Sequence, residues 1–592
     1  MAEKKPNIVF VLTDDQGYPD LGCTGNPHIQ TPNIDGFYAE SARLNDFHVA
    51  PLCAPTRGAL LTGHRPTKNG VWATCWGRSL LKTSEITLAD VLKANGYSTG
   101  MFGKWHLGDN YPYRPQDRGF DTVIAHKGGG VGQTPDFWGN NYYDDTYFHD
   151  GEPVKHTGYC TDVWFEEAMG FIRGKHACDA SFFAYIATNA PHWPYLVDEK
   201  YAARYRGIED VVSPEFYGMI ENIDENFGKL RDLLKELKIE DETLLIFMTD
   251  NGSSASAQLD ANQFAVKGYN AGMRGLKGSY YEGGHRVPCI MRWPGGGIQN
   301  RDIGEIGFHI DFMPTLLDLC GIEPPAGIGF DGASLASLLR GEKQRLEGER
   351  VDFVQYRQYT EPPKKWENAV ITREYRLING RELYNIKEDP GQKLDISGDN
   401  PKMVEHMRGL HEDWWSEVSP HLEDYSPITI GSDMENPTRL DSMDVMGDVA
   451  WNQNHIAAAK ASTGKWSINV CREGKYRITL RRWPKEFPLG IYDACSTEEA
   501  EKLAPYEKIQ PGTISPKLAQ ISLFEDTYEL PVKGDEQEVA FEIDMPHRGQ
   551  TVLEAWFIGE NQKQGAYYVY IERKNGGLQT WPQAKLIHWS KH

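Results

Sequence analysis

The sequence predicts an α/β fold in which helices sandwich a central sheet, followed by a small C-terminal α+β subdomain and an appended C-terminal β-sandwich. Three observations support this prediction. Short, unbroken apolar runs of strand length occur at 7–12, 182–188 and 244–249. A segment with helical spacing of apolar residues, 214–238, lies between the last two runs. From about residue 421, apolar and polar residues alternate over several short stretches.

The first part of the chain has the pattern of a parallel sheet with crossover helices. Unbroken apolar runs such as "NIVFVL" at 7–12 indicate strands that are covered on both faces. In 214–238 the apolar residues that share one helical face are Phe216, Ile220, Ile223, Phe227, Leu230 and Leu234. The segment 400–415 repeats this spacing, and we expect its helix to complete this part of the protein.

The alternating stretches near the C-terminus indicate half-buried antiparallel strands. In 465–470, Trp466, Ile468 and Val470 face one side of the expected strand, and the polar residues between them face the other. Similar stretches begin at positions 475, 538, 551 and 566. We therefore expect residues 1–345 to form the α/β domain, 346–420 the small subdomain, and 421–592 a linker with the β-sandwich.

The composition limits the partners of the chain. Lys and Arg number 62 and Asp and Glu number 84, which gives a net charge of −22. This balance argues against nucleic acid and anionic membranes as partners, and an anionic substrate would need a local cationic pocket. The nine cysteines are scattered without a Cys-x-x-Cys pair, so neither a disulfide framework nor a structural zinc site is indicated.

No apolar stretch approaches the roughly 20 residues of a membrane span, so we expect no membrane association. The start "MAEKKPNIVFVL" runs directly into an expected core strand. We therefore expect a cytoplasmic protein, or a periplasmic or secreted one if an export signal has been removed. The oligomeric state is not indicated.

Two strand ends repeat the same pattern of hard oxygen ligands. Asp14 and Asp15 follow the run at 7–12, and Asp250 and Asn251 follow the run at 244–249. Because the carboxyl ends of parallel strands meet at one edge of a sheet, we expect these side chains to converge. Their oxygens suit Ca²⁺, or else Mg²⁺, and a cation would offset the repulsion between the carboxylates. The alternative is that these residues only form turns after the strands.

The segment "PLCAPTRGALLTGHRP" at 51–66 places a lone thiol near an arginine. Cys53 and Arg57 are four positions apart, so they share a face if a helix begins here, and Arg57 can hold an anion formed at residue 53. The alternative is a buried small thiol with a surface arginine. From its chemistry alone, Cys53 is a candidate nucleophile.

The segment from Cys53 to Gly63 resembles the signature of type I sulfatases in the alkaline phosphatase superfamily. Further segments are similar to other blocks of that family in the same order, among them "LTDDQG", "GYSTGMFGKWHLG", "TDNG", "GLKGSYYEGGHRVPCIMRWPG" and "ELYNIKEDPGQKLDIS". The resemblance covers about residues 1–420 and does not include the expected sandwich. It implies a mixed sheet between helices, as in alkaline phosphatase.

The resemblance also implies a mechanism. Cys53 would be converted to formylglycine by a formylglycine-generating enzyme that reads Pro55 and Arg57. One hydroxyl of the hydrated aldehyde would attack sulfur, and the second would then lose its proton and expel sulfate. The roles implied for the other residues are diol contact for Arg57, a fixed cation and a base for Lys104 and His106, protonation of the leaving oxygen for His192, and a grip on a sulfate oxygen for Lys277.

The sequence therefore indicates a metal-dependent sulfuric ester hydrolase that acts on aryl sulfates or sulfated carbohydrates. One alternative is a phosphonate monoester or phosphodiester hydrolase of the same superfamily. The other is a non-catalytic glycan-binding homologue. The aromatic cluster of Phe137, Trp138, Tyr142 and Tyr143 fits either a stacking wall for sugar rings or part of the core.

Overall fold

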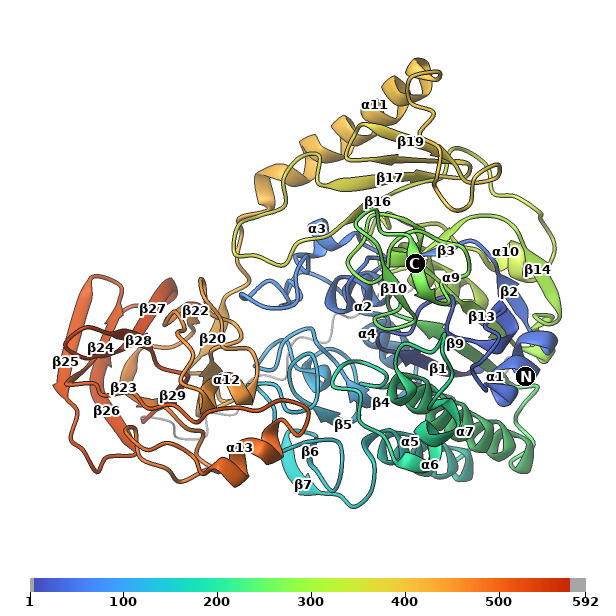
Figure 1. The fold of residues 1–592 in the computed structure, drawn as a ribbon. Helices are drawn as coiled ribbons and strands as arrows, with labels where there is room; N and C mark the ends of the chain where they lie inside the picture. The colour runs from blue at the N-terminus through green and yellow to red at the C-terminus, as the bar shows by residue number, and fades with distance from the viewer. Residues whose placement is uncertain (1–4, 575–592) are drawn as a thin grey trace.

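A ten-stranded mixed sheet forms the centre of the larger domain in the computed structural model, which describes residues 5–574 (Figure 1). The strand order is β14-β2-β13-β9-β1-β8-β4-β5-β6-β7. The bounds are β1 Asn7–Thr13, β2 Ala42–Leu44, β4 Ser98–Lys104, β5 Thr122–His126, β6 Thr146–His149, β7 Glu152–Lys155, β8 Phe182–Ala187, β9 Thr243–Thr249, β13 Cys289–Arg292 and β14 Arg301–Ile303. The five central strands from β9 to β5 are parallel, and β13 joins β9 in the antiparallel direction.

Strand β1 is buried on both faces because its side chains alternate between two cores. Ile8, Phe10 and Leu12 lie in one core with helices α2, α4 and α9, and Val9 and Val11 lie in the other with α5 and α7. The helices span α1 Pro32–Glu40, α2 Cys53–Thr62, α4 Leu88–Ala94, α5 Cys160–Ala177, α7 Pro214–Glu236 and α9 Phe312–Leu319. The expected sheet covered on both faces is confirmed.

Helix α7 shows how the sequence specifies these layers. It begins after Ser213, whose hydroxyl accepts a hydrogen bond from Phe216 N at 3.1 Å, and a proline occupies its first turn. Its buried residues follow helical spacing along the face that packs on the sheet. Each such side chain contributes about 1.5–3 kcal/mol of burial free energy, so this amphipathic face keeps α7 in place.

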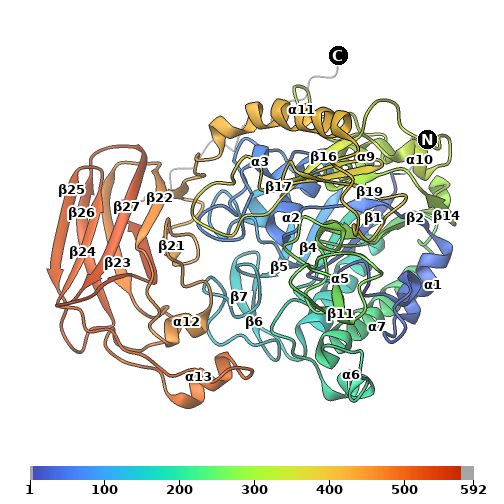
Figure 2. The ribbon, with the colours of Figure 1, turned by 45° about the horizontal axis from the view of Figure 1, so that its top comes forward.

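A smaller antiparallel sheet lies beside the central one, with a long helix across it (Figure 2). Its strands are β16 Val351–Gln355, β17 Asn368–Thr372, β18 Tyr375–Ile378 and β19 Glu382–Asn385, and the helix is α11 Pro401–Val418. Val404, Met407 and Trp414 of α11 pack against this sheet. The helical spacing at 400–415 therefore produces the helix that the sequence predicted.

The C-terminal part is a sandwich of two sheets, in the orders β20-β22-β27-β24-β25, with β28 beside β27, and β21-β29-β23-β26. The strands are β20 Ile428–Ile430, β21 Thr438–Asp441, β22 Lys465–Val470, β23 Gly474–Arg481, β24 Leu518–Leu523, β25 Asp526–Pro531, β26 Glu538–Met545, β27 Gly549–Ile558, β28 Lys563–Gly565 and β29 Tyr568–Arg573. Trp466, Ile468 and Val470 of β22 point into the core between the sheets, as their alternation predicted.

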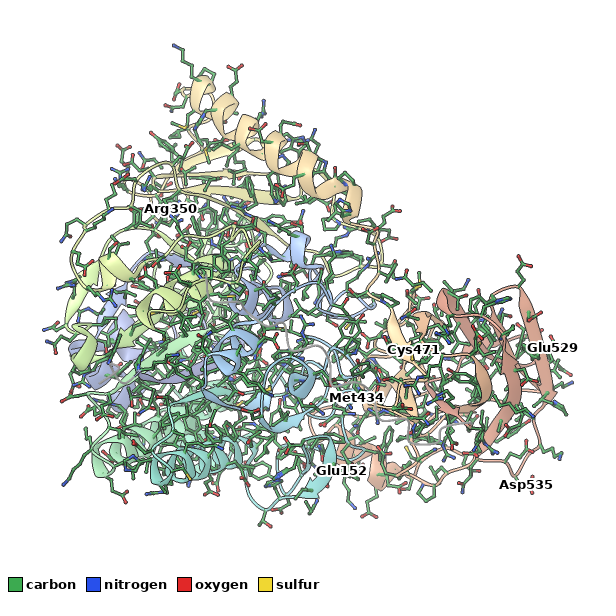
Figure 3. The ribbon with its side chains drawn as sticks, turned by 180° about the vertical axis from the view of Figure 1, so that it is seen from behind. Glu152, Arg350, Met434, Cys471, Glu529 and Asp535 are labelled. Carbon is green, nitrogen blue, oxygen red and sulfur yellow. The ribbon has the colours of Figure 1, made fainter. Side chains whose placement is uncertain are left out.

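The sandwich is attached to the α/β domain by packing as well as by the chain. Trp138 lies against Trp483 and Phe487 of the sandwich domain, with ring centroids 5.3 and 5.1 Å apart. Figure 3 shows the junction from behind, where Glu152 and Met434 line one cavity between the domains. Trp138 therefore serves interdomain packing and Tyr142 is buried in the core, whereas Tyr143 is exposed, so only part of the aromatic cluster at 137–143 belongs to the packed interior.

Short elements complete the fold: α3 Pro66–Asn69, α6 Glu199–Ala202, α8 Glu282–His285, α10 Ala336–Leu339, α12 Gln453–Ala457, α13 Thr497–Leu503, β3 Phe47–His48, β10 Ala257–Leu259, β11 Ala265–Gly268, β12 Arg286–Val287 and β15 Gly307–Phe308. Among the helices of residues 5–574, none has both the length and the apolar character needed to cross a membrane.

Candidate active site

The predicted metal ligands meet at the carboxyl ends of β1 and β9. These strands are parallel neighbours with Thr13 opposite Thr249, so the residues that follow them emerge side by side. Asp14, Asp15 and Asp250 are buried and bring carboxylate oxygens within 4.8 Å of one another. The turns that follow β1 and β9 pack closely against each other. A Cβ on Gly17 would lie 2.3 Å from Ser253 N, so only glycine fits at position 17.

The oxygen atoms of this cluster fit one hard divalent cation. Within residues 5–574, Asp14 Oδ1 and Asn251 Oδ1 are buried without a hydrogen-bond partner, and Arg57 Nη2 is 3.9 Å from the former. Asn251 Nδ2 donates to Asp15 Oδ1 at 3.0 Å, which leaves the amide oxygen free to bind a cation. Burial raises the pKa of Asp14 well above its usual range, and the neighbouring carboxylates raise it further. A bound cation would relieve this repulsion.

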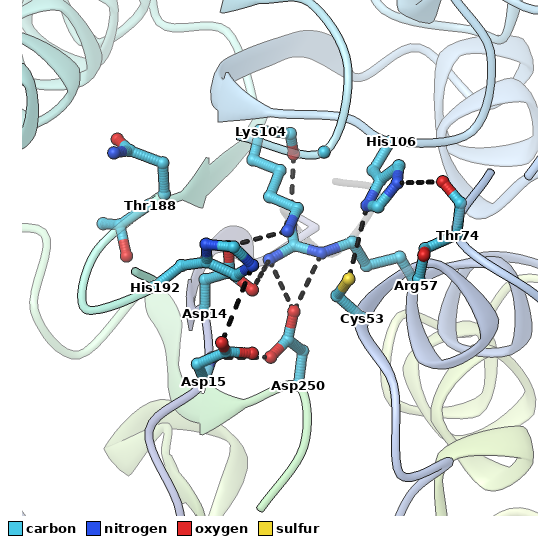
Figure 4. A network of polar contacts seen from close by, with 12 residues as sticks. Asp14, Asp15, Cys53, Arg57, Thr74, Lys104, His106, Thr188, His192 and Asp250 are labelled. Carbon is cyan, nitrogen blue, oxygen red and sulfur yellow. Dashed lines mark hydrogen bonds and ion pairs between the residues drawn. The ribbon is translucent and has the colours of Figure 1, made fainter. Parts of the chain in front are cut away.

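Lys104, Arg57 and Lys277 supply positive charge to the same carboxylates, and Figure 4 shows the first two beside Asp14 and Asp250. Lys104 Nζ, at the end of β4, donates to Asp14 Oδ2 at 2.7 Å. Lys277 Nζ donates to Asp15 Oδ2, also at 2.7 Å. Burial opposes ionisation of Asp15, but Lys277, followed by His192 and Lys104, lowers the pKa of this carboxyl below its usual range. Asp15 is therefore ionised at neutral pH.

Arg57 is fully buried in α2 and lies one turn after Cys53. Its Nε and Nη2 donate to Asp250 Oδ2 at 3.0 and 2.8 Å, and its Nη1 donates to the carbonyl of Lys104 at 3.1 Å. We expected the guanidinium to face an anion at residue 53, whereas its hydrogen bonds here go to Asp250 and to the backbone. Arg57 thus joins the helix of Cys53 to the carboxylate cluster, and its contact with a diol stays a prediction.

Cys53 is the first residue of α2, and its Sγ lies 3.3 Å from His106 Nδ1. His106 Nε2 lies 2.9 Å from the carbonyl oxygen of Thr74, which can only accept, so Nε2 holds the proton. The lone pair of Nδ1 then faces Cys53. Burial, followed by Lys104, lowers the pKa of His106 well below its usual range, so the ring is neutral and can act as a base.

A glycine-rich loop covers His106 on its other side. A Cβ on Gly129 would lie 2.4 Å from His106 Cε1, so the backbone approaches the ring more closely than any side chain would allow. Gly129 N donates to Gln133 Oε1 at 2.7 Å, which closes the loop on itself. The glycine run at 128–130 was the sequence signal for this contact, but spacing along the chain did not identify His106 as its partner.

His192 follows β8 at the same edge of the sheet as Asp15. Its Nδ1 donates to the carbonyl of Trp193 at 2.5 Å, and its Nε2 is 3.7 Å from Asp15 Oδ2. Burial lowers the pKa of His192 to about 3, Asp15 acts in the opposite direction, and Lys277 and Lys104 lower it further. The negative charge of a bound ester would raise this pKa and favour a proton on Nε2.

A cavity of about 750 Å³ opens above these groups, and Cys53, His106, His192 and Lys277 line it. The other six predicted residues are buried and are connected to these four by the contacts above. The wall also includes residues that we did not predict: Thr74, Trp76 and Gln133 from the α/β domain, Gln358 and Tyr359 from the small subdomain, and Trp451 and Lys460 from the sandwich domain. The site can therefore place an anionic group beside a helix-borne nucleophile, a base and several cations.

The sequence and the fold match known families. A family model described as Sulfatase matches residues 6–322, and one described as N-sulphoglucosamine sulphohydrolase, C-terminal, matches 276–417. The chain is 32% identical over 363 residues to N-acetylgalactosamine-6-sulfatase of Mus musculus, which covers 58% of this chain and 68% of that protein. It is also 32% identical over 364 residues to human arylsulfatase A, with 57% and 68% covered.

The structure is similar to the crystal structure of Ps i-CgsB in complex with k-i-k-neocarrahexaose. The two have a TM-score of 0.61 and 28% sequence identity, and the match covers 69% of this chain and 93% of that one. Both family models end before the sandwich, which begins at β20.

Proposed function

Because the chain belongs to the sulfatase family and is a sulfuric ester hydrolase, we propose that it releases sulfate from sulfated carbohydrates through formylglycine formed at Cys53. The observation that supports this most directly is the position of Cys53. Its side chain lies in the pocket at the start of α2, 3.3 Å from the basic nitrogen of a neutral histidine. A nucleophile at residue 53 would therefore have a proton acceptor in place.

A formylglycine-generating enzyme would convert Cys53 before the protein acts. The hydrated aldehyde supplies one hydroxyl that attacks sulfur and a second whose deprotonation releases sulfate. His106 Nδ1 is placed to take a proton from this residue, and its Nε2–H is held by Thr74. Arg57, one helical turn away, keeps α2 fixed relative to Asp250. The chain's own contribution is thus to orient residue 53 and to accept a proton there.

One Ca²⁺, or else Mg²⁺, would be held by oxygens of Asp14, Asp15, Asp250 and Asn251. It would supply positive charge to the sulfate oxygens. The three carboxylates are already matched by Lys104, Lys277 and Arg57, so a divalent cation would leave this cluster with net positive charge. That excess suits an anionic sulfate ester in a protein whose net charge is −22.

The function is tested by comparing reaction rates on 4-nitrophenyl sulfate, a phenyl phosphonate monoester and a bis-aryl phosphodiester. We expect kcat/KM on the sulfate to exceed that on the other two by about 100-fold, which is about 2.7 kcal/mol of transition-state discrimination. Faster turnover of the phosphonate or the phosphodiester would favour the alternative hydrolase. Binding of sulfated sugars without any turnover by protein containing formylglycine would favour the glycan-binding alternative.

His192→Ala should affect substrates according to their leaving groups. The proposed general acid matters most when the departing oxygen is basic, as in a sugar, so we expect about a 100-fold loss of kcat on a sugar sulfate. The loss on 4-nitrophenyl sulfate should be less than about tenfold, since nitrophenolate leaves without help. The two kcat values are measured on one preparation. Equal losses on both substrates would contradict the role of His192 as general acid.

A further inference from the structure

We propose that segment 443–461 of the sandwich domain is a recognition wall for the sugar part of the substrate. In this proposal Trp451 stacks on a sugar ring, and Lys460 pairs with a second anionic group, a sulfate or a carboxylate, on the same glycan. The inference rests on the proposed function, because it assumes that the ester to be cleaved is placed at Cys53. It names the specificity-determining residues of that site.

The cavity above Cys53 is enclosed by three parts of the chain. The α/β domain supplies its base, and the small subdomain supplies residues 358–361. The residues contributed by the recognition wall are Met443, Gly447, Asp448, Val449, Trp451, Lys460 and Ala461. At about 750 Å³, the cavity is far larger than a sulfate group requires and within the range of pockets for whole organic ligands. The additional space is bounded in part by the sandwich domain.

The recognition wall is fixed to the loop that covers the catalytic histidine. Thr134 N donates to the carbonyl of Trp451 at 3.0 Å, and Gln133 forms a β-bridge with Asn452. Gln453 Oε1 accepts from Gly139 N at 2.9 Å. Since the Gln133 side chain also holds Gly129 over His106, the wall and the base are joined by one connected set of hydrogen bonds. The wall therefore stands at a fixed position relative to the reacting group.

Each part of the cavity contributes an aromatic ring to its lining: Trp76, Tyr359 and Trp451. Trp451 is half-buried, and its ring meets that of His455 edge to face at 5.0 Å, which holds its orientation. Tyr359 is 58% exposed. Aromatic rings at a cavity surface offer flat apolar faces to the C–H groups of a sugar, a contact that a bare sulfate cannot use.

Lys460 gives the recognition wall a charge that is not neutralised. Its side chain is exposed at the cavity, and no ion pair or hydrogen bond joins its ammonium to any residue in 5–574. The other lysine of the lining, Lys277, is already paired with Asp15. Asp448 and Glu361 line the same cavity and would repel an anion. A second anionic group on the substrate is therefore favoured at Lys460 and disfavoured beside the two acids.

The recognition wall lies outside the part of the chain that the family models match. Both family models end by residue 417, and the recognition wall begins at 443. The catalytic part could bind a sulfate ester without it. The sandwich domain thus converts a general site for sulfate esters into one that selects the glycan around the ester.

The test compares Lys460→Ala with the wild type on three substrates. These are a disaccharide with two sulfate esters, a disaccharide with one sulfate ester and one carboxylate, and 4-nitrophenyl sulfate. For at least one disaccharide we expect the KM of Lys460→Ala to be about tenfold higher than that of the wild type. Its kcat should stay within about twofold of the wild-type value, because the lost ion pair acts in binding. The rise in KM should exceed that for 4-nitrophenyl sulfate by at least about fivefold. A similar change for all three substrates, or no change, would overturn the proposal.

Trp451→Ala should raise KM for both disaccharides, and Trp451→Phe should restore most of the affinity because it keeps an aromatic face. Failure of Trp451→Phe to improve on alanine would contradict stacking. Lys475→Ala is the matched control, because Lys475 is an exposed lysine of the same domain that does not line the cavity. It should behave as the wild type. Thermal unfolding of each variant separates lost binding from lost folding.

Direct binding separates this inference from the proposed function. If the wild type hydrolyses no sulfate ester, the proposed function fails, but isothermal titration calorimetry with the same two disaccharides still tests the recognition wall. Binding that Lys460→Ala weakens about tenfold supports the wall in that case. No binding by the wild type, or equal binding by both proteins, overturns it.

Discussion

Replacing Cys53 with alanine is expected to lower multiple-turnover release of sulfate by about 1,000-fold or more, as the loss of a nucleophile does in other enzymes. Cys53→Ser should lose as much, because one serine hydroxyl cannot both attack sulfur and expel the sulfate afterwards. The fold should persist, since the change is small and local, and the polar contact it removes is that of Sγ with His106 Nδ1 at 3.3 Å. Initial rates and thermal unfolding of the purified variants measure both effects.

Cys160→Ala provides the matched control. Cys160 is also a buried cysteine at the first position of a helix, α5, and it lies outside the pocket lining. Its replacement should leave kcat within about twofold, which would show that removing a buried thiol is not itself the cause. If Cys53→Ala or Cys53→Ser retained multiple turnover comparable to the wild type, residue 53 would not be the nucleophile.

Removal of the divalent cation should both inactivate the enzyme and lower its thermal stability. Three buried carboxylates lie within 4.8 Å of one another and would bind the cation only in the folded state. A ligand that binds only the folded state raises the free energy of unfolding by about 2.7 kcal/mol when its concentration is 100 times its Kd. We expect chelation to lower the midpoint of unfolding by a few degrees, and added Ca²⁺ to restore it. Calorimetry of the chelated protein with and without Ca²⁺ provides this measurement independently of activity.

Substitution of one ligand sharpens the test. Asp14→Asn should reduce Ca²⁺ affinity by about 100-fold, because a charged ligand of the cluster becomes neutral. Asp20→Asn is the control: burial raises the pKa of Asp20 to about 7, and its Oδ2 accepts from Gly17 N at 2.8 Å, outside the cluster. Asp20→Asn should keep one bound Ca²⁺ by elemental analysis. Equal Ca²⁺ content and affinity in Asp14→Asn and the wild type would contradict the metal assignment.

The parts of the fold that were predictable are those set by local pattern. Unbroken apolar runs identified strands buried between two layers, because such strands have no solvent-facing side. The convergence of Asp14 and Asp250 was predictable for a related reason, since parallel neighbouring strands deliver their final residues to one edge. Alternation in 465–470 identified a strand with one buried face. In each case a few adjacent residues contain the necessary information.

The contacts that were not predictable depend on how distant segments pack. Arg57 lies one helical turn from Cys53 as expected, but its hydrogen bonds to Asp250, 193 positions away in the chain, were not predicted. His106, whose Nδ1 lies 3.3 Å from Cys53 Sγ, has a backbone φ of 61°, a left-handed conformation that its sequence context did not indicate. Trp138 packs against Trp483, a residue of the sandwich domain that lies more than 300 positions later in the chain. Spacing along a chain cannot specify such partners.

The lining of the pocket shows the same limit in a functional setting. Trp451 and Lys460 occur in a segment with no recognisable motif, and only the docking of the sandwich brings them to the cavity of Cys53. Their residue types are those that a glycan site requires, an aromatic face and a free cation. The sequence signal that could have directed attention to them was the presence of a whole extra domain after the family blocks.

The conversion of Cys53 is tested most directly by peptide mass spectrometry of an active preparation. The peptide that contains residue 53 should be present with an aldehyde-bearing residue in some fraction of the molecules. Across preparations from hosts with different maturation capacity, specific activity should be proportional to that fraction. A fully active preparation in which every molecule retains unmodified cysteine at position 53 would contradict the formylglycine mechanism.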